Sequence, residues 1–356
     1  ISMGGLEKMV KFVANSCVDV YDEVYLLSIF ESENFMPIKS EINIIKMRIK
    51  EDWLGSNKNK IKSFYHHLLV MIKLRKIIRN INPQVVCAFG SDVAFITRTA
   101  LLGVNTKVIA SERGDPNSYN KKTKIFTQFA YSRCDGLSFQ TVGARNYFSK
   151  KIQEKSVVIP NPYYPIDDKQ IPFEGERKKT VVAAGRFVEP KGFDLLIKAF
   201  SIVKQSFPEY KLRIYGDGPC QDDYLELIKK LNLSDSVSFP GKVLNLSGVI
   251  REDGVFVLPS RALEGIPNVI IDAMTIGVPV VATDCSPGGP AMLTDNGKRG
   301  VLVSLNDIEA LSQGIIKVIS DPLYAKHISN EGLVLREELN KEKIAKRWIE
   351  LFKKFV

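Results

Sequence analysis

The sequence lacks several features that mark specialised classes of protein. Among its 356 residues there is no run of eighteen or more apolar residues, which argues against a membrane-spanning helix. Internal repeats and low-complexity tracts are also missing. Cysteine and histidine are few and lack the spacing of a metal site, and the unpatterned cysteines favour reduced thiols in the cytosol. These residues are Cys17, Cys87, Cys134, Cys220, Cys285, His66, His67 and His327.

What the sequence does contain is a repeated alternation of strand-like and helix-like segments. Short apolar runs bounded by glycine, proline or polar residues alternate with segments of helical periodicity in both halves of the chain. Such alternation predicts parallel sheets with helices on both faces, and the length suffices for two domains of ordinary size. The predicted fold class is therefore α/β, with two doubly wound Rossmann-like domains facing each other across a cleft.

Composition predicts where these domains begin and end. The first domain is expected to cover residues 1–160, and a stretch rich in proline and polar residues, 161–179, is the predicted linker. The second domain is expected to cover 180–335, with a last helix in 336–356 that packs back on the first domain. The opening ISMGGLEK is typical of the turn and helix start that follow a strand, so we expect the natural protein to have a first strand before Ile1.

The densest group of functional signals lies in residues 255–283. The apolar run Val255–Leu258 predicts a buried strand, and the loop after it carries Glu264. Because proline is tolerated at the first position of a helix, Pro267 predicts a helix that starts near Asn268. The free N–H groups of that helix would lie beyond the carboxyl end of the strand, where open α/β sheets bind ligands and where a phosphate is favoured.

Two acids flank this helix start, and two cations follow an earlier strand. Asp272 lies one turn inside the predicted helix, eight positions after Glu264. Arg186 and Lys191 lie in the segment GRFVEPKG, directly after the predicted strand Thr180–Ala184. Cations at the carboxyl ends of parallel strands suit the binding of a phosphorylated ligand. Both groups also fit an ordinary α/β scaffold with a charged surface.

The segment SRALEGIPNVIIDAMTIGVPVVATD closely resembles the signature of family 4 glycosyltransferases, which are retaining enzymes of the GT-B fold. That family carries a glutamate, seven residues and a second glutamate, where this chain has Glu264 and Asp272. The second carboxylate therefore has a side chain that is one methylene shorter. The sequence has no Asp-x-Asp motif, which counts against the metal-dependent GT-A glycosyltransferases. The resemblance covers most of Gly4–Val303 and is strongest from Thr180 onward.

The resemblance implies a role for each residue of a donor site. Arg186 and Lys191 match the family's motif that holds the donor diphosphate. Glu264 would approach the transferred sugar, and Asp272 would hold the ribose hydroxyls. In such enzymes the leaving phosphate assists a front-face attack, so no protein nucleophile, cofactor or metal is expected. The expected catalytic residues are Glu264, Lys191 and Arg186, and the implied donor-binding set is Gly185, Arg186, Lys191, Gly216, Gly218, Gly241, Val243, Glu264, Gly265, Ile266, Pro267, Asn268, Val269 and Asp272.

The first domain is expected to supply contacts to the acceptor or to phosphate. Gly4 and Gly5 resemble the family's glycine loop, where bare backbone lies against the donor phosphates or the acceptor. The loop SERGDP is expected to direct Glu112 and Arg113 toward the cleft from a strand end. Many relatives have histidine where this chain has Arg113, and a permanent cation suggests contact with a phosphate of the acceptor. The turn glycines of the second domain, Gly216 among them, also fit a purely structural role.

A basic segment from Lys46 to Arg79 accounts for much of the formal net charge of +10. It contains ten Lys or Arg against two acids, Glu51 and Asp52, and large apolar and aromatic residues lie between the charges. This composition suits the surface of an anionic membrane. It also fits a solvated helix face. Nucleic acid is the least favoured partner because no nucleic-acid-binding motif accompanies the segment.

With the resemblance, these signals predict a metal-independent hexosyltransferase that is cytoplasmic and peripheral on the inner face of the cell membrane. It would move a sugar from a nucleotide donor, expected to be UDP-linked, to a lipid-diphosphate-linked saccharide during surface polysaccharide assembly. Two other functions remain open. One is a nucleotide-sugar epimerase that shares the GT-B architecture, and the other is a non-catalytic two-domain protein that binds a nucleotide-sugar.

Overall fold

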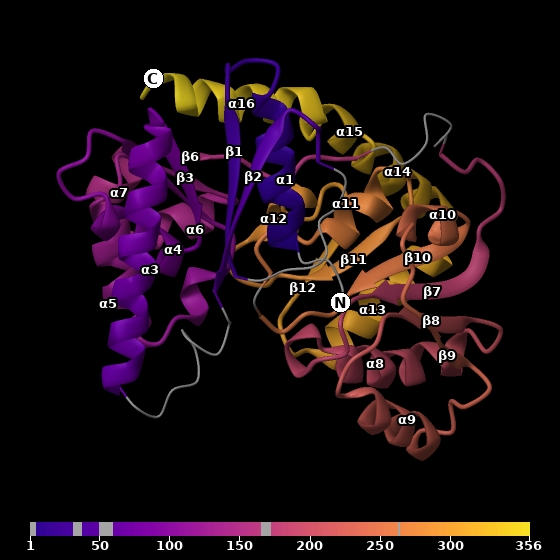
Figure 1. The fold of residues 1–356 in the computed structure, drawn as a ribbon. Helices are drawn as coiled ribbons and strands as arrows, with labels where there is room; N and C mark the ends of the chain where they lie inside the picture. Colours follow the sequence, from indigo (N-terminus) through magenta and orange to yellow (C-terminus); the bar gives the residue numbers. More distant parts are fainter. Residues whose placement is uncertain (1–4, 31–37, 50–59, 165–171, 263) are drawn as a thin grey trace.

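The second half of the chain forms a six-stranded parallel sheet (Figure 1). Its strand order is β12-β11-β10-β7-β8-β9, so the direction of winding reverses between β7 and β10, as it does in doubly wound sheets. The computed structural model describes residues 5–30, 38–49, 60–164, 172–262 and 264–356. The six strands are β7 (Lys178–Ala184), β8 (Lys211–Tyr215), β9 (Val237–Gly241), β10 (Asp253–Leu258), β11 (Val280–Thr283) and β12 (Val301–Val303).

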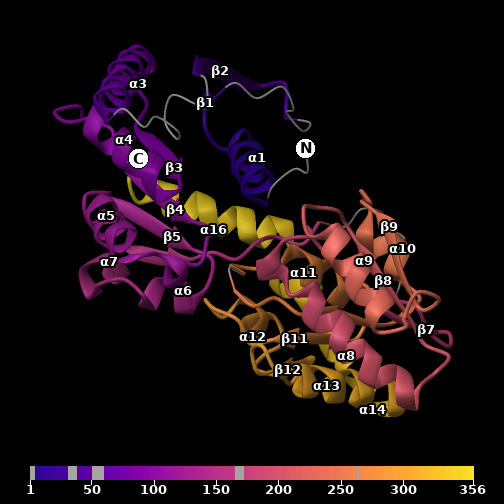
Figure 2. The same ribbon diagram turned by 90° about the horizontal axis from the view of Figure 1, so that it is seen from below.

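Helices cover both faces of this sheet because its strands are apolar on both sides (Figure 2). These helices are α8 (Phe193–Ser206), α9 (Gln221–Lys230), α10 (Leu246–Ile250), α11 (Asn268–Met274), α12 (Gly289–Leu293), α13 (Ile308–Ser320), α14 (Pro322–Gly332) and α15 (Leu335–Glu338). Along β7, Val181 and Ala183 pack in one core with α8, α9, α13 and α14. Val182 and Ala184 point the other way and pack with α10, α11 and α15.

The first half of the chain contains a four-stranded parallel sheet and a separate parallel pair. The sheet has the order β3-β4-β5-β6, and the pair is β1 with β2. The strands are β1 (Val24–Phe30), β2 (Ile42–Ile49), β3 (Val85–Phe89), β4 (Lys107–Glu112), β5 (Gly136–Phe139) and β6 (Ser156–Val158). The helices are α1 (Gly5–Cys17), α3 (Lys60–Ile81), α4 (Ser91–Ala100), α5 (Lys121–Ser132), α6 (Val142–Asn146) and α7 (Lys150–Glu154).

The last helix, α16 (Lys341–Lys353), lies against the first half rather than the second (Figure 1). Trp348 is fully buried there, in a cluster with Met9 of α1, Ile109 of β4 and Ile159. This helix is amphipathic, and burial of its apolar side stabilises the return of the chain to the first half. The two halves are therefore connected twice along the sequence, once through residues 159–178 and once through residues 339–341.

The predicted fold class is confirmed: each half is a parallel α/β unit of Rossmann-like type. The structure adds detail that periodicity did not predict, because the separation of β1 and β2 from β3 depends on pairing between segments distant in sequence. Three predictions fall partly outside the described residues. They concern Gly4, residues 50–59 of the basic segment and residues 165–171 of the predicted linker.

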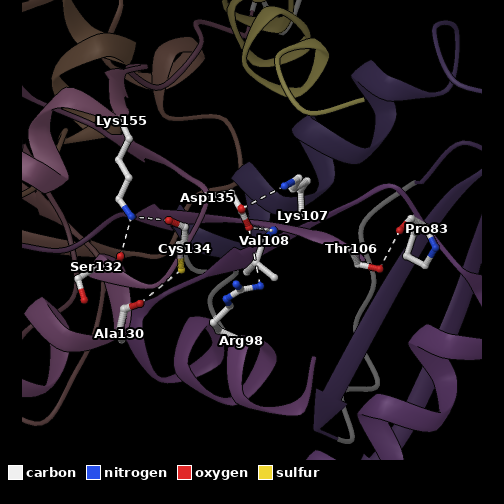
Figure 3. A network of polar contacts seen from close by, with 10 residues as sticks. All are labelled: Pro83, Arg98, Thr106, Lys107, Val108, Ala130, Ser132, Cys134, Asp135 and Lys155. Atoms are coloured by element: carbon white, nitrogen blue, oxygen red, sulfur yellow. Dashed lines mark hydrogen bonds and ion pairs between the residues drawn. The ribbon is translucent and has the colours of Figure 1, made fainter. Parts of the chain in front are cut away.

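A partly buried acid ties the amino ends of β4 and β5 together (Figure 3). The carboxylate of Asp135, which precedes β5, accepts a hydrogen bond from the backbone N–H of Val108 at 2.9 Å. Lys107 lies 3.6 Å and Arg98 3.9 Å from the same carboxyl group. Close to this carboxyl group, the ammonium group of Lys155 donates a hydrogen bond to the backbone oxygen of Ser132 at 2.8 Å. This network fixes the register of the two central strands whose other ends approach the second half.

Loss of the Asp135 carboxylate should destabilise the first half. We expect Asp135→Ala to lower the free energy of unfolding, measured in urea, by about 1–3 kcal/mol, because the Val108 N–H is left buried without a partner. The matched control is Asp19→Ala, since Asp19 is 75% exposed in its ion pair with Lys39 and should contribute no more than about 1 kcal/mol. Equal effects of the two substitutions would contradict this account of the network.

Candidate active site

The candidate site lies where β7 and β10 are neighbours at the centre of the second sheet. The loop after β7 carries Arg186 and Lys191, and the loop after β10 carries Glu264. Because both strands run parallel, their carboxyl ends open at the same edge, and this is the point where the strand order reverses. Ligands of doubly wound sheets bind in such places.

Lys191 and Glu264 are brought into direct contact at this edge. The ammonium group of Lys191 donates a hydrogen bond to Oε1 of Glu264, which also accepts one from the hydroxyl of Ser260 at 2.6 Å. Ser260 is held in turn by Thr283 of β11, whose hydroxyl donates to the Ser260 backbone oxygen at 2.5 Å. The Glu264 side chain is 7% exposed and that of Lys191 is 30% exposed. The Glu264 carboxylate is thus fixed by its buried contact with Ser260, while the Lys191 ammonium group is still partly exposed to solvent.

Two contacts hold the loops that carry this ion pair. The guanidinium of Arg261 binds the carboxylate of Asp194 at the start of α8 through two hydrogen bonds of 2.6 Å each. Gly192 has a φ of 66°, and a Cβ built on it would lie 2.1 Å from the backbone oxygen of Pro259. Glycine is required there because the loop after β7 approaches the end of β10 closely. The Lys191–Glu264 pair therefore rests on a rigid junction.

The other residues predicted for the donor site lie along the same edge. Arg186 is exposed, and its side chain makes no ion pair or hydrogen bond within the described parts of the chain. A Cβ on Gly216 would lie 1.9 Å from the backbone oxygen of Gly185, so the turn after β8 packs directly on the loop of Arg186. Gly218 approaches Phe187 in the same way. Both glycines thus have a structural reason to be glycine.

Other residues predicted for the donor site lie at the end of β9 and around the start of α11. Gly241 ends β9 opposite Tyr215, and Val243 packs partly buried against the core under α10 and α11. The helix α11 begins at Asn268, as predicted, but Pro267 is its N-cap rather than its first helical residue. Ile266 is buried and Val269 is partly buried in the same core, so their side chains serve packing and only their backbone is available to a ligand.

Asp272 lies inside α11 with its carboxyl group largely removed from water. Burial raises the pKa of Asp272 from 3.8 to about 6, and the nearby charge of Lys8 on α1 partly opposes the rise. Lys8 belongs to the first half of the chain, so this electrostatic influence crosses between the halves. Gly5, the member of the predicted glycine loop that lies within the described residues, is the first residue of α1.

The structure does not bring the side chains of Glu112 and Arg113 to the ion pair. Both oxygens of the buried Glu112 are occupied, because they accept hydrogen bonds from the hydroxyls of Tyr119 and Tyr131 and from the backbone N–H groups of residues 113 and 114. The Arg113 guanidinium lies 5.4 Å from the centre of the Trp348 ring and donates to Ile159. Burial lowers the pKa of Arg113 to about 10.

Arg113 still has unused capacity for hydrogen bonding. Its Nε and Nη2 groups are buried, and within the described residues they have no hydrogen-bond partner. A hollow of about 570 Å³ lies at the carboxyl ends of β3 and β4, and Glu112 rather than Arg113 is among its lining residues. Polar residues that line it include Ser91, Asp92, Tyr119 and Lys122. Sequence reasoning missed this hollow, although Ser91 and Asp92 directly follow a predicted strand and could have indicated it.

Sequence reasoning also missed the hydrogen bonds that connect the two halves near Glu264. Gln140 follows β5, and its Nε2 donates to Oδ1 of Asn161 at 2.9 Å. Asn161 donates onward to Oδ1 of Asn268 at 2.8 Å. The hydroxyl of Thr141 donates to the backbone oxygen of Pro287 at 2.8 Å. Each of these first-half residues follows a strand of the first sheet, which is the signal that could have singled them out.

The raised pKa of Asp272 predicts a pH-dependent stability. The folded state binds the Asp272 proton more tightly than the unfolded state, so the free energy of unfolding should fall as the pH rises from about 4 to about 6. Asp272→Asn should remove this loss and be about 1–3 kcal/mol more stable than the parent at pH 8, with no advantage at pH 4. Thermal unfolding at both pH values measures this. A pH profile identical to that of the parent would contradict the assignment.

Comparisons with known proteins find glycosyltransferases among the proteins similar to this chain. The family model described as Glycosyl transferases group 1 matches residues 166–334. A glycosyltransferase of Haemophilus influenzae, itself uncharacterized, is 26% identical over 98% of this chain and 96% of its own length. A Campylobacter jejuni enzyme is 22% identical over 99% of this chain and 95% of its own length; its name is GalNAc-alpha-(1->4)-GalNAc-alpha-(1->3)-diNAcBac-PP-undecaprenol alpha-1,4-N-acetyl-D-galactosaminyltransferase.

A solved structure shows the same architecture. The crystal structure of Anabaena HepE in complex with UDP is similar with a TM-score of 0.78, at 16% sequence identity, over 99% of this chain and 96% of that one. A likeness at this identity establishes the fold alone. The chain therefore has the GT-B fold, and its sequence relatives support a glycosyltransferase.

Proposed function

We propose that this protein is a retaining glycosyltransferase that moves a hexose from a UDP-linked donor to a lipid-diphosphate-linked saccharide. The observation that carries the proposal is the contact of Lys191 with Glu264 at the point where the strand order reverses. A cation and a carboxylate on a fixed junction match the two needs of this reaction. The leaving diphosphate needs positive charge, and the hydroxyl groups of the sugar need an acceptor.

The donor diphosphate would be held by side chains and backbone without a metal ion. Arg186 is exposed and unpaired among the described residues, so its guanidinium is available to a phosphate. Lys191 would exchange part of its contact with Glu264 for a phosphate oxygen when the donor binds. Asp272 would hold the ribose hydroxyls, and hydrogen bonds from these hydroxyls would offset the desolvation cost that raises the pKa of Asp272. The similar HepE was solved in complex with UDP, which supports the choice of nucleotide.

The proposed reaction takes place on one face of the sugar. The bond between the anomeric carbon and the phosphate oxygen breaks, and a bond from the same carbon to the acceptor oxygen forms on that face. The proton of the acceptor hydroxyl passes to the departing phosphate oxygen, so no protein nucleophile is needed. Lys191 and Arg186 would stabilise the charge that grows on the diphosphate, and Glu264 would orient the sugar.

The acceptor is proposed to bind in the hollow beside β3 and β4. Lys122 supplies a cation at its wall. Positive charge there suits the diphosphate of a lipid-linked saccharide. The Campylobacter jejuni relative is named for an acceptor that carries PP-undecaprenol, which supports this acceptor class. Glu112 is proposed to shape the hollow, since its own oxygens are already occupied.

Release of UDP tests this function. The purified protein should release UDP from a UDP-sugar only when a lipid-diphosphate-linked acceptor is present. Lys191→Ala and Glu264→Ala should each lower kcat/KM by about 30- to 900-fold, because removal of a preorganised charged group costs about 2–4 kcal/mol of transition-state stabilisation. Lys298→Ala is the control, since Lys298 is 77% exposed and precedes β12, at the amino end of a strand whose carboxyl end faces the site edge, and should retain parental activity.

Two results would contradict the proposed function. Parental turnover by both Lys191→Ala and Glu264→Ala would remove the ion pair from the chemistry. UDP binding without release under any pairing of donor and acceptor would favour a non-catalytic binding protein. Interconversion of the donor sugar without an acceptor would instead favour the epimerase, which is measured by chromatography of the sugar released on acid hydrolysis.

We propose in addition that α3 places the enzyme on an anionic membrane surface. Tyr65, Leu68 and Ile72 are exposed and recur at helical spacing, with exposed fractions of 56%, 41% and 57%. Lys76 and Arg79 continue the same stripe toward the end of α3, and both are exposed. Apolar side chains beside cations along one helix face suit the headgroup region of a bilayer. Within the described residues, no helix is long and apolar enough to cross a membrane.

Vesicle flotation tests the membrane proposal. The protein should float with vesicles that contain about one-third anionic lipid at low salt and dissociate when salt is raised, because the attraction is partly electrostatic. The combined substitution Leu68→Asp and Ile72→Asp should abolish flotation. Leu323→Asp, at an 81% exposed position on α14 of the second half, should leave flotation unchanged. Failure of the parent to float at low salt would leave α3 as a solvated helix.

A further inference from the structure

A relay of buried amide side chains connects the first half of the chain to the loop that carries Glu264. Nε2 of Gln140 donates to Oδ1 of Asn161 at 2.9 Å. Nδ2 of Asn161 donates both to the backbone oxygen of Ile266 at 3.3 Å and to Oδ1 of Asn268 at 2.8 Å. Gln140 is 5% exposed and Asn161 is 4% exposed, so water does not compete for these bonds.

The relay lies tightly against the proposed donor loop at Gly265. A Cβ built on Gly265 would lie 2.1 Å from Oε1 of Gln140 and 3.0 Å from the backbone oxygen of Arg113. Gly265 directly follows Glu264, Ile266 lies in the same loop, and Asn268 is the first residue of α11. The first half therefore holds this segment at three positions, at Gly265 by close approach and at Ile266 and Asn268 by hydrogen bonds.

Gln140 retains an unsatisfied group in this arrangement. Its Oε1 is buried and has no hydrogen-bond partner among the described residues. A buried amide oxygen without a partner is destabilising by about 1–3 kcal/mol, so an apolar side chain of the same shape would serve packing better. The presence of glutamine indicates that its Nε2 group is needed, because within the described residues this group donates to Oδ1 of Asn161 and so directs the Asn161 amide toward the loop.

We propose that Gln140 and Asn161 are positioning residues for the glycosyl transfer. Through them the first half sets the placement of Glu264 and of the start of α11 once the two halves are together. This inference rests on the proposed function, because the loop it concerns is the proposed donor loop. Neither residue is assigned a contact with the transferred sugar or with the acceptor. Their effect is to hold the loop in the geometry in which Glu264 meets the donor.

Isosteric substitutions separate positioning from stability. Asn161→Asp keeps the shape of the side chain but loses both donations to the loop, and Gln140→Met keeps the volume but loses the donation to Asn161. We expect kcat to fall by about tenfold to a hundredfold in each variant, because small misplacements of reacting groups have effects of this size. UDP affinity should stay within about twofold, since the diphosphate cations are untouched. Gln140→Met should be as stable as the parent or more so, because the unpaired Oε1 is gone.

A conservative variant adds a readout that a structural role would not affect. In Gln140→Glu, a protonated carboxyl can donate to Asn161 whereas the ionised carboxylate repels its Oδ1. The kcat of this variant, taken relative to the parent at each pH, should therefore recover as the pH is lowered from 8 toward 5.5.

The double variant Gln140→Met with Asn161→Asp should have a kcat little lower than that of Asn161→Asp alone, because both substitutions act through the same hydrogen bonds. Gln313→Met, at an exposed glutamine of α13, is the control.

The outcomes distinguish this inference from the proposed function. If the parent and Gln313→Met turn over while Gln140→Met and Asn161→Asp retain parental kcat, the inference fails and the function stands. Losses of kcat that scale with a lowered unfolding temperature, without recovery of Gln140→Glu at low pH, also overturn the inference. If the parent itself releases no UDP, the proposed function fails and the inference fails with it.

Discussion

A cation and a carboxylate, Lys191 and Glu264, meet where β7 and β10 lie side by side, and much of the second half keeps them there. Glu264 is fixed by Ser260 beneath it, and Ser260 is fixed by Thr283 of the next strand. The loop of Lys191 is tied to β10 through the close approach of Gly192 to Pro259. In the proposed function, Lys191 of this fixed pair, which is partly open to solvent, would receive the negative charge of the donor diphosphate.

The first half contributes a different kind of constraint. Its strands end in polar residues that reach across to the second half, and the hydrogen bonds are buried where the halves touch. Helix α16 adds an apolar connection, since Trp348 is fully buried against the first sheet. The relative placement of the halves is therefore set by packing at one end and by amide contacts at the other. The proposed donor loop is held from both sides, which brings residues over a hundred positions apart in the sequence to one place in the fold.

The sequence predicted a good part of this arrangement, for identifiable reasons. Apolar runs and helical periodicity located β7, β10 and α11, and the rule that ligands bind beyond the carboxyl ends of parallel strands placed Lys191 near Glu264. Periodicity could not predict that β1 and β2 pair apart from β3. It also could not predict that Glu112 is occupied by Tyr119 and Tyr131. Both depend on contacts between segments distant in sequence, and such contacts leave no local pattern.

Because contacts between distant segments leave no local pattern, sequence reasoning did not single out Gln140 and Asn161. Each follows an ordinary strand and belongs to no charged or glycine-rich motif, and their shared importance appears only when Asn161 is seen to contact Asn268. Arg113 illustrates the converse case. Its position after β4 predicted a side chain directed at the site, whereas the guanidinium lies over Trp348 and only its backbone approaches Gly265. Strand ends predict where backbone lies better than they predict where long side chains point.

The central claim is that Lys191 meets the diphosphate of a nucleotide donor. Titration calorimetry with UDP and with uridine, on the parent and on Lys191→Ala, tests it most directly. The account predicts that the parent prefers UDP to uridine and that Lys191→Ala reduces this preference by about tenfold or more, as loss of a charged hydrogen bond should. An unchanged preference for UDP in Lys191→Ala would contradict the account.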